Sequence, residues 1–165
     1  MLYLLDANVL IDANRDYYPL DRVPEFWDWL VEKGNESRIQ VPLEQYEEII
    51  TGNDELVNWA KGTNVKQALL LNEEVNGDLV AEIVDSAYAN DLTDDEIEKI
   101  GRDPFLIAYA LIDIENRCVV TTEASKPSRQ RANRHIPDVC NALNIPWCNT
   151  FTLLRKLDFK TGWNR

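Results

Sequence analysis

The chain alternates between short apolar runs and longer segments in which apolar residues recur at helical spacing. The two clearest strand candidates are Met1 to Leu5 and Cys118 to Thr122, and an acid follows each of them at once. A nearly continuous apolar run of this length is typical of a strand buried on both faces of a parallel sheet. Shorter runs at residues 39–41 and 145–148 predict two further strands.

Helical periodicity and helix-boundary residues account for most of the remaining chain. Gly34 is expected to stop one helix, Asp54 and Asp103 are expected N-caps, and Thr93 with Glu96 matches a capping box. One predicted helix starts at residue 9. The others cover residues 25–33, 43–51, 55–61, 75–89, 94–100, 104–114, 137–143 and 151–157.

Strands that alternate with helices indicate an α/β fold with a mainly parallel central sheet. In such sheets ligands bind beyond the carboxyl ends of the strands. A chain of 165 residues with 45% hydrophobic residues is long enough for one domain with its own core.

The composition limits the classes of partner. The net charge of −12 is unlike that of a nucleic-acid coat protein, which needs basic surface against phosphates. No apolar run is long enough to cross a bilayer, and the N-terminus lacks the basic start of a signal peptide. Three cysteines without a CxxC pair are typical of reduced thiols, so we expect a cytoplasmic protein without membrane contact.

Three acids occupy positions that a parallel α/β fold brings to one edge of the sheet. Asp6 and Glu123 end the two best strands, and Asp103 begins the most apolar helix. Crowded carboxylates repel one another unless a cation neutralises them, and Mg²⁺ or Mn²⁺ prefers such oxygen ligands. Taken singly, Asp103 is explained better as a helix cap, and Asp6 is explained equally well as a turn residue. Together the three acids favour a metal site.

A fourth ligand is expected from the helix over residues 43–51, which carries Glu44, Glu47 and Glu48. Leu43, Tyr46, Ile49 and Ile50 form the apolar face of this helix. Glu47 borders that face and Glu48 lies nearly opposite, so periodicity alone favours Glu47.

Four short motifs resemble those of the PIN-domain nucleases. Leu4 to Ile11 resembles the opening strand with its Asp-x-Asn element, and Asp103 to Ala110 is similar to the central Asp-x-x-(Ile/Leu)-Ala-x-Ala helix start. Val119 to Glu123 resembles the Val-Thr-x-Asp strand end, with Glu in place of Asp. Tyr46 to Ile49 resembles the Glu-Leu/Ile element and puts the ligand at Glu48.

Further motifs extend the resemblance over nearly the whole chain, to an uncharacterised bacterial and archaeal branch of these proteins. The resemblance implies a three-layer α/β/α sandwich, here one domain with a helical insert around residues 75–100. It also implies a metal-dependent ribonuclease, similar to VapC-type toxins with their protein antitoxins, and a frequent homodimer. Asp6, Glu48, Asp103 and Glu123 would hold one or two Mg²⁺ or Mn²⁺ ions, and Asn8 would orient Asp6.

Two alternatives belong to other classes. A haloacid-dehalogenase-type phosphatase also begins with a strand that ends in Asp, but it needs a second Asp where this chain has Asn8. The other alternative is a PIN fold that has lost catalysis and serves as a binding module.

The charge is divided unevenly along the chain. Residues 1–116 carry eight Lys and Arg against 26 Asp and Glu, whereas residues 117–165 carry nine against three. Four of these basic residues follow Glu123 closely: Lys126, Arg129, Arg131 and Arg134. We therefore expect a basic loop that binds RNA phosphates at the mouth of the acidic site.

Overall fold

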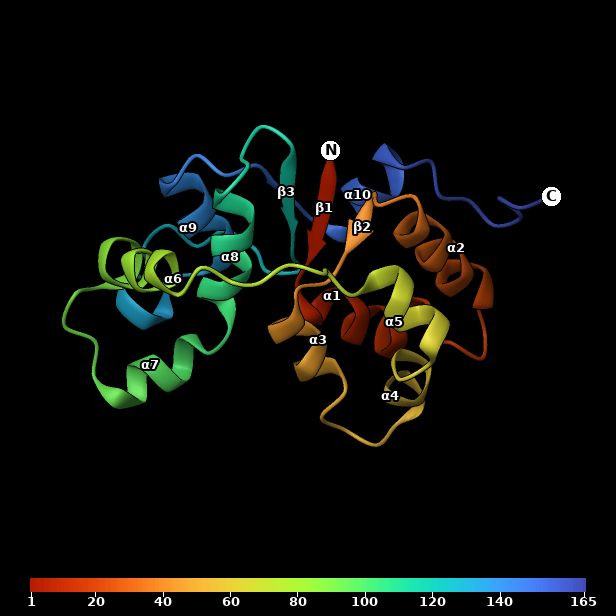
Figure 1. The fold of residues 1–165 in the computed structure, drawn as a ribbon, viewed down its shortest axis with the longest axis horizontal. Helices are drawn as coiled ribbons and strands as arrows, with labels where there is room; N and C mark the ends of the chain where they lie inside the picture. The colour runs from red at the N-terminus through yellow and green to blue at the C-terminus, as the bar shows by residue number, and fades with distance from the viewer.

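A four-stranded parallel sheet forms the centre of the computed structural model, which describes all 165 residues (Figure 1). The strands are β1 (Leu2–Leu5), β2 (Ile39–Gln40), β3 (Arg117–Val120) and β4 (Trp147–Cys148), in the spatial order β2-β1-β3-β4. All three pairings are parallel, so every strand ends at the same edge of the sheet.

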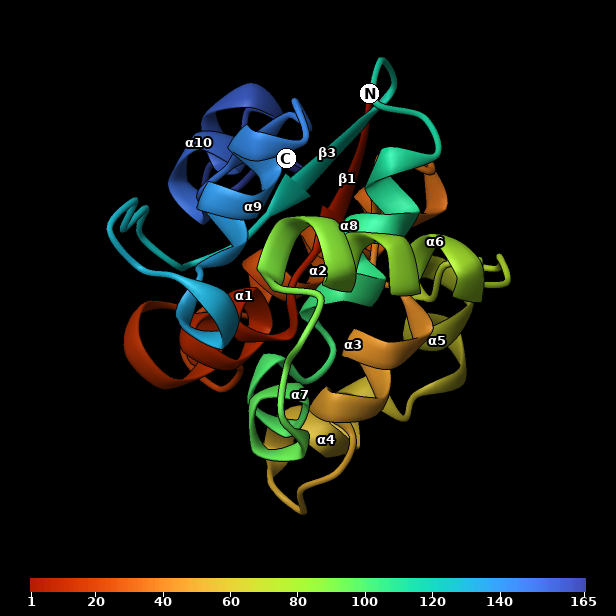
Figure 2. The same ribbon diagram turned by 90° about the vertical axis from the view of Figure 1, so that its left-hand side faces the viewer.

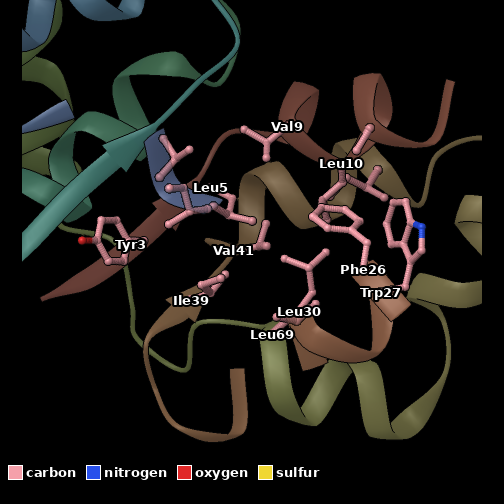
Figure 3. Packing of buried hydrophobic residues seen from close by; sticks show 14 of the residues in the cluster. Tyr3, Leu5, Val9, Leu10, Phe26, Trp27, Leu30, Ile39, Val41 and Leu69 are labelled. Carbon is pink, nitrogen blue, oxygen red and sulfur yellow. The ribbon is translucent and has the colours of Figure 1, made fainter. Parts of the chain in front are cut away.

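Side chains alternate between the two faces of the sheet and build two separate cores. Tyr3, Leu5 and Val120 join the larger core, part of which Figure 3 shows. Leu4 and Val119, one residue away along each strand, join the smaller core on the other face. A sheet with a helical layer on each face is the predicted three-layer α/β/α sandwich, and that prediction is confirmed.

Six helices supply side chains to the larger core. They are α1 (Ala7–Asp12), α2 (Pro24–Asn35), α3 (Leu43–Ile49), α4 (Glu55–Ala60), α5 (Thr63–Leu69) and α10 (Thr150–Lys156).

The smaller core lies under four helices, which Figure 2 shows from their own side. They are α6 (Gly77–Ile83), α7 (Asp94–Ile100), α8 (Asp103–Leu111) and α9 (Ile136–Ala142). Two π-helical turns, η1 (Ala13–Tyr17) and η2 (Val84–Tyr88), extend α1 and α6, and a 3₁₀ turn, η3 (Arg131–Asn133), precedes α9.

The structure corrects several predicted boundaries. The helix predicted over 75–89 is α6 followed by the η2 turn, and the strand predicted over 118–122 ends at Val120. Asp103 is the first residue of α8 rather than its N-cap, which is Arg102. Helix α5 has no counterpart among the predicted elements.

The segment between β2 and β3 contains the helices α3 to α8 and the η2 turn. Within it α6 packs on α8, and α7 packs on η3 of the basic loop. The predicted insert therefore forms part of the wall of the sheet's carboxyl edge. No helix of the chain combines the length and the apolar character that a membrane span requires.

Helices α2 and α5 touch at Gly34, which explains this glycine better than a helix stop does. Helix α2 continues to Asn35, one residue beyond the glycine. A Cβ atom at position 34 would lie 2.6 Å from the carbonyl oxygen of Ala68 and 2.8 Å from a methyl group of Leu69. The two helix backbones can approach this closely only because Gly34 has no side chain.

We predict that Gly34→Ala lowers the free energy of unfolding by about 1 to 3 kcal/mol, because the added methyl group would push against the backbone of α5. Urea unfolding of the purified variant measures this change. Gly77→Ala is the matched control, because a Cβ atom there meets nothing within 4 Å. Equal losses in both variants would contradict the proposed close contact.

Candidate metal centre at the carboxyl edge of the sheet

Asp6 lies at the carboxyl end of β1 and is only 4% exposed. Its backbone N–H donates to the carbonyl oxygen of Val120 at 2.9 Å, which ties the residue to the end of β3. The hydroxyl of Thr121 donates to Oδ2 of Asp6 at 2.9 Å.

Thr121, rather than Asn8, orients the Asp6 carboxylate through a side chain. Asn8 also acts on the Asp6 carboxylate, through its backbone N–H. The predicted hydrogen bond from Asn8 to Asp6 is therefore made by the main chain. Thr121 is fully buried, so its hydroxyl has few other positions to adopt.

Asp103 points its carboxylate toward the same edge from the first turn of α8. Burial, together with the negative charges of Asp6, Glu123 and Glu48, raises the pKa of Asp103 to about 8. Burial and the charges of Glu123 and Glu48 raise the pKa of Asp6 to about 6, against the opposing effect of Thr121. The charges of Glu123 and Glu48 therefore act on both aspartates at this edge of the sheet.

One carboxylate oxygen of Glu123 accepts a hydrogen bond, and the other has no hydrogen-bond partner. Oε2 accepts the backbone N–H of Ile136 at 2.7 Å, which fixes the start of α9. The Glu123 backbone N–H in turn donates to the Thr121 hydroxyl at 3.2 Å. One threonine hydroxyl therefore connects two of the acids.

The structure distinguishes Glu48 from its neighbour Glu47 on α3. Glu48 acts on both Asp6 and Asp103 through its charge. Glu47 instead forms an ion pair with Arg102 at 3.0 Å. Helical periodicity pointed to Glu47, whereas the side chain that faces the other acids is Glu48.

Arg102 and Gln45 hold α3 against the start of α8. The Arg102 guanidinium donates to the carbonyl oxygen of Glu44 as well as to Glu47. The buried Gln45 side chain donates to the carbonyl oxygen of Arg102 at 2.9 Å. Because Glu48 and Asp103 lie on these two helices, the contacts fix their separation.

None of the four acids forms an ion pair with a lysine, arginine or histidine. No three Asp, Glu, His or Cys side chains stand close enough together to surround one ion directly. Magnesium tolerates such spacing, because it binds proteins through one or two carboxylates and retains several waters. A set of four carboxylates without a basic partner, in which the pKa values of Asp6 and Asp103 are raised, fits Mg²⁺ or Mn²⁺ by its chemistry.

A cleft of about 300 Å³ opens beside Asp103 and Glu123. Three basic side chains line it: Lys99 from α7, and Arg129 and Arg134 from the segment after Glu123. Lys99 was not predicted, because only the packing of α7 on η3 brings it to this cleft.

The four basic residues predicted to bind RNA take different places. Arg129 lines the cleft without an ion pair, and the Lys126 side chain is exposed. Arg134 also lines the cleft but donates to the carbonyl oxygens of Ala87 and Asp138.

Arg131 departs from the prediction, because it is neutralised by two acids. It pairs with Asp91 at 2.6 Å and with Glu96 at 2.8 Å. This arginine connects η3 to the segment that leads into α7, so its charge is not free for a phosphate.

Asp138 is a buried acid that does not join the other four. It accepts hydrogen bonds from the hydroxyl of Ser125 at 2.5 Å and from the backbone N–H of Lys126 at 2.8 Å. Asp138 therefore holds the basic loop in place.

The fold and the site together define an α/β protein with an acidic cluster at the carboxyl edge of a parallel sheet. The chain belongs to the family described as "Domain of unknown function (DUF4411)", whose model matches residues 3–161. No curated protein and no solved structure matches the chain.

We predict that Asp103→Asn raises the melting temperature at pH 8 by roughly 5 °C in metal-free buffer, since about 1 kcal/mol corresponds to about 2 to 4 °C at this chain length. The native state keeps protons on Asp6 and Asp103 that the unfolded chain releases near pH 4. Their contribution to stability is therefore complete below that pH and is lost as pH rises through about 6 and about 8. The gain from Asp103→Asn should shrink toward pH 4.

Thermal unfolding between pH 4 and pH 8 in the presence of EDTA measures this effect. Asp28→Asn is the control, because Asp28 is exposed on α2 and forms no ion pair. A pH-independent difference between Asp103→Asn and the wild type would contradict the predicted repulsion.

Proposed function

We propose that this protein is a divalent-metal-dependent ribonuclease that hydrolyses RNA phosphodiester bonds. The observation that carries the proposal is the set of four neighbouring acids without a basic partner, two of which have raised pKa values. Such a set is unfavourable unless a cation completes it. The adjacent cleft with Arg129 and Lys99 supports a polyanionic substrate.

Asp6, Glu48, Asp103 and Glu123 would hold one or two Mg²⁺ or Mn²⁺ ions, each through one or two carboxylates and retained waters. When bound, the metal supplies a water of lowered pKa and a positive charge against the attacked phosphate. The chain's own residues do the positioning. Thr121 holds Asp6 in one orientation, Ile136 holds one oxygen of Glu123, and Arg129 attracts the neighbouring phosphates.

The finer parts of the proposal rest on the resemblance to PIN-domain nucleases. They are the choice of RNA over DNA, action as a toxin with a protein antitoxin, and a homodimer. A cytoplasmic location is also proposed, and the three cysteines support it because all are buried free thiols.

We predict that Glu48→Gln lowers Mn²⁺-dependent cleavage of single-stranded RNA at least roughly 100-fold, as expected for a lost electrostatic contribution in the site. Asp6→Asn and Asp103→Asn should abolish cleavage. Initial rates on a labelled oligonucleotide measure these effects. Glu47→Gln is the matched control from the next position of α3, and its rate should stay within a few-fold of the wild type. Equal effects at positions 47 and 48 would refute the assignment of Glu48.

A catalytically silent binding module is the second candidate. One observation favours it: no three acidic side chains are placed so that they could hold one ion directly. If wild-type protein binds RNA without cleaving it in Mn²⁺, and Mn²⁺ leaves its melting temperature unchanged, the binding module replaces the nuclease. A phosphatase would hydrolyse p-nitrophenyl phosphate and leave RNA intact, and Asn8 in place of the required acid disfavours it.

We predict that the double variant Lys126→Ala/Arg129→Ala weakens RNA binding and reduces the slope of log K against log salt by about 1.4, or about 0.7 for each lost phosphate contact. Fluorescence anisotropy at several salt concentrations measures the slope. The control is Lys61→Ala/Lys66→Ala, which removes two exposed charges from the α4–α5 region, on the far side of the sheet (Figure 1). A slope equal to that of the control would show that the basic loop does not contact RNA.

A further inference from the structure

A second cleft, of about 200 Å³, is lined by none of the four acids of the proposed metal site. It lies where the η1 turn meets the start of α10, and we call it the base cleft. Its lining residues are Asp12, Asp16, Tyr17, Thr122, Asn149, Thr150 and Phe151. Thr122 directly precedes Glu123, so the base cleft begins one residue from the acids.

The base cleft has an exposed aromatic wall. Phe151 is 49% exposed, and its ring centroid lies 5.3 Å from that of Tyr17. The η1 turn is π-helical and brings Tyr17 to the same cleft as Asp12 from the end of α1. The contact with Tyr17 fixes one edge of the Phe151 ring and leaves ring surface open to solvent.

Beside this wall lies a carboxylate oxygen without a hydrogen-bond partner. The buried Thr150 hydroxyl and the Tyr17 hydroxyl lie next to each other behind it, enclosed by the protein. Asp12 bonds Arg15 through Oδ1 at 2.8 Å and keeps Oδ2 free.

A phosphate does not suit this cleft, because two carboxylates line it and Arg15 already pairs with both. A flat heterocycle with a hydrogen-bonding edge does suit it, since the ring can stack on Phe151 while its edge reaches the free carboxylate oxygen of Asp12. The free carboxylate oxygen of Asp12 attracts an amino group and repels a carbonyl oxygen at the same place on a base.

We propose that the base cleft binds one nucleobase of the RNA strand and prefers a base with an exocyclic amino group. This inference rests on the proposed ribonuclease function, because it places the base next to the phosphate beside which the acids would hold the metal. The strand would cross the acids between the base cleft and the basic cleft lined by Arg129. Phe151 supplies the stacking surface, and Asp12 accepts from the amino group.

Octacytidine and octauridine form a matched pair of probes, because cytosine carries an amino group where uracil carries a carbonyl oxygen. Binding of each labelled oligonucleotide to the full chain is measured by fluorescence anisotropy in EDTA, where no metal-dependent cleavage interferes. We expect wild-type protein to bind octacytidine at least about five-fold more tightly than octauridine. Asp12→Asn should remove this preference, because an amide can donate as well as accept.

Phe151→Ala should weaken the binding of both oligonucleotides at least about five-fold through lost stacking. The matched control is Ile112→Ala. Ile112 is 51% exposed and follows α8 at the opposite edge of the sheet. Far-ultraviolet circular dichroism checks that each variant is folded.

Three outcomes would each overturn the proposal that the base cleft binds a nucleobase. They are equal affinity of the wild-type protein for the two probes, no binding of either probe, and a Phe151→Ala variant that binds like Ile112→Ala. Cleavage of the same oligonucleotides in Mn²⁺ tests the proposed function separately. If the oligonucleotides are cleaved in Mn²⁺ but bind with equal affinity, the ribonuclease proposal stands and the base-cleft proposal is refuted. If they bind with different affinities but neither is cleaved, the base-cleft proposal stands and the ribonuclease proposal is refuted.

Discussion

Negative charge that no basic side chain neutralises is concentrated at the carboxyl edge of the sheet, and much of the surrounding structure keeps it there. A parallel sheet directs the ends of β1 and β3 to the same edge, so Asp6 and Glu123 are brought together by topology. Helix α8 adds Asp103 from its first residue, and α3 adds Glu48. Burial makes their repulsion stronger, because little solvent remains to screen it.

Several hydrogen bonds hold these acids despite that repulsion. Thr121 bonds both Asp6 and the backbone of Glu123, and Arg102 with Gln45 holds α3 against α8. The result is a set of acids held in position before any ligand arrives. Pre-positioned charge of this kind is what a catalytic or cation-binding site requires, and it is costly for a surface that has no such role.

In the folded protein, part of the basic charge that follows Glu123 is used in contacts within the chain. The basic segment after Glu123 is held by Asp138 and by the ion pairs of Arg131 to Asp91 and Glu96. Part of its charge therefore stabilises the docking of the segment that contains α7. Arg129 remains free at the cleft, and α7 contributes Lys99.

Much of the fold could be predicted from local sequence. The apolar strands, the Asp54 cap and the Thr93 capping box all correspond to elements of the structure. Helix α5 could not be predicted in the same way, because Gly62 precedes it without a side-chain cap. Its apolar side chains join the larger core because Gly34 lets α2 and α5 approach closely.

The sequence by itself determined that buried parallel strands end in acids and that basic residues follow one of them, because apolar runs and charges are local properties. Tertiary structure decided which glutamate of α3 faces the acids, that Thr121 holds Asp6, and that Arg131 is neutralised. Helical periodicity identifies the face that meets the core, but it does not identify what a side chain outside that face will meet. Thr121 and Asp6 are 115 residues apart, so only the folded sheet brings them together.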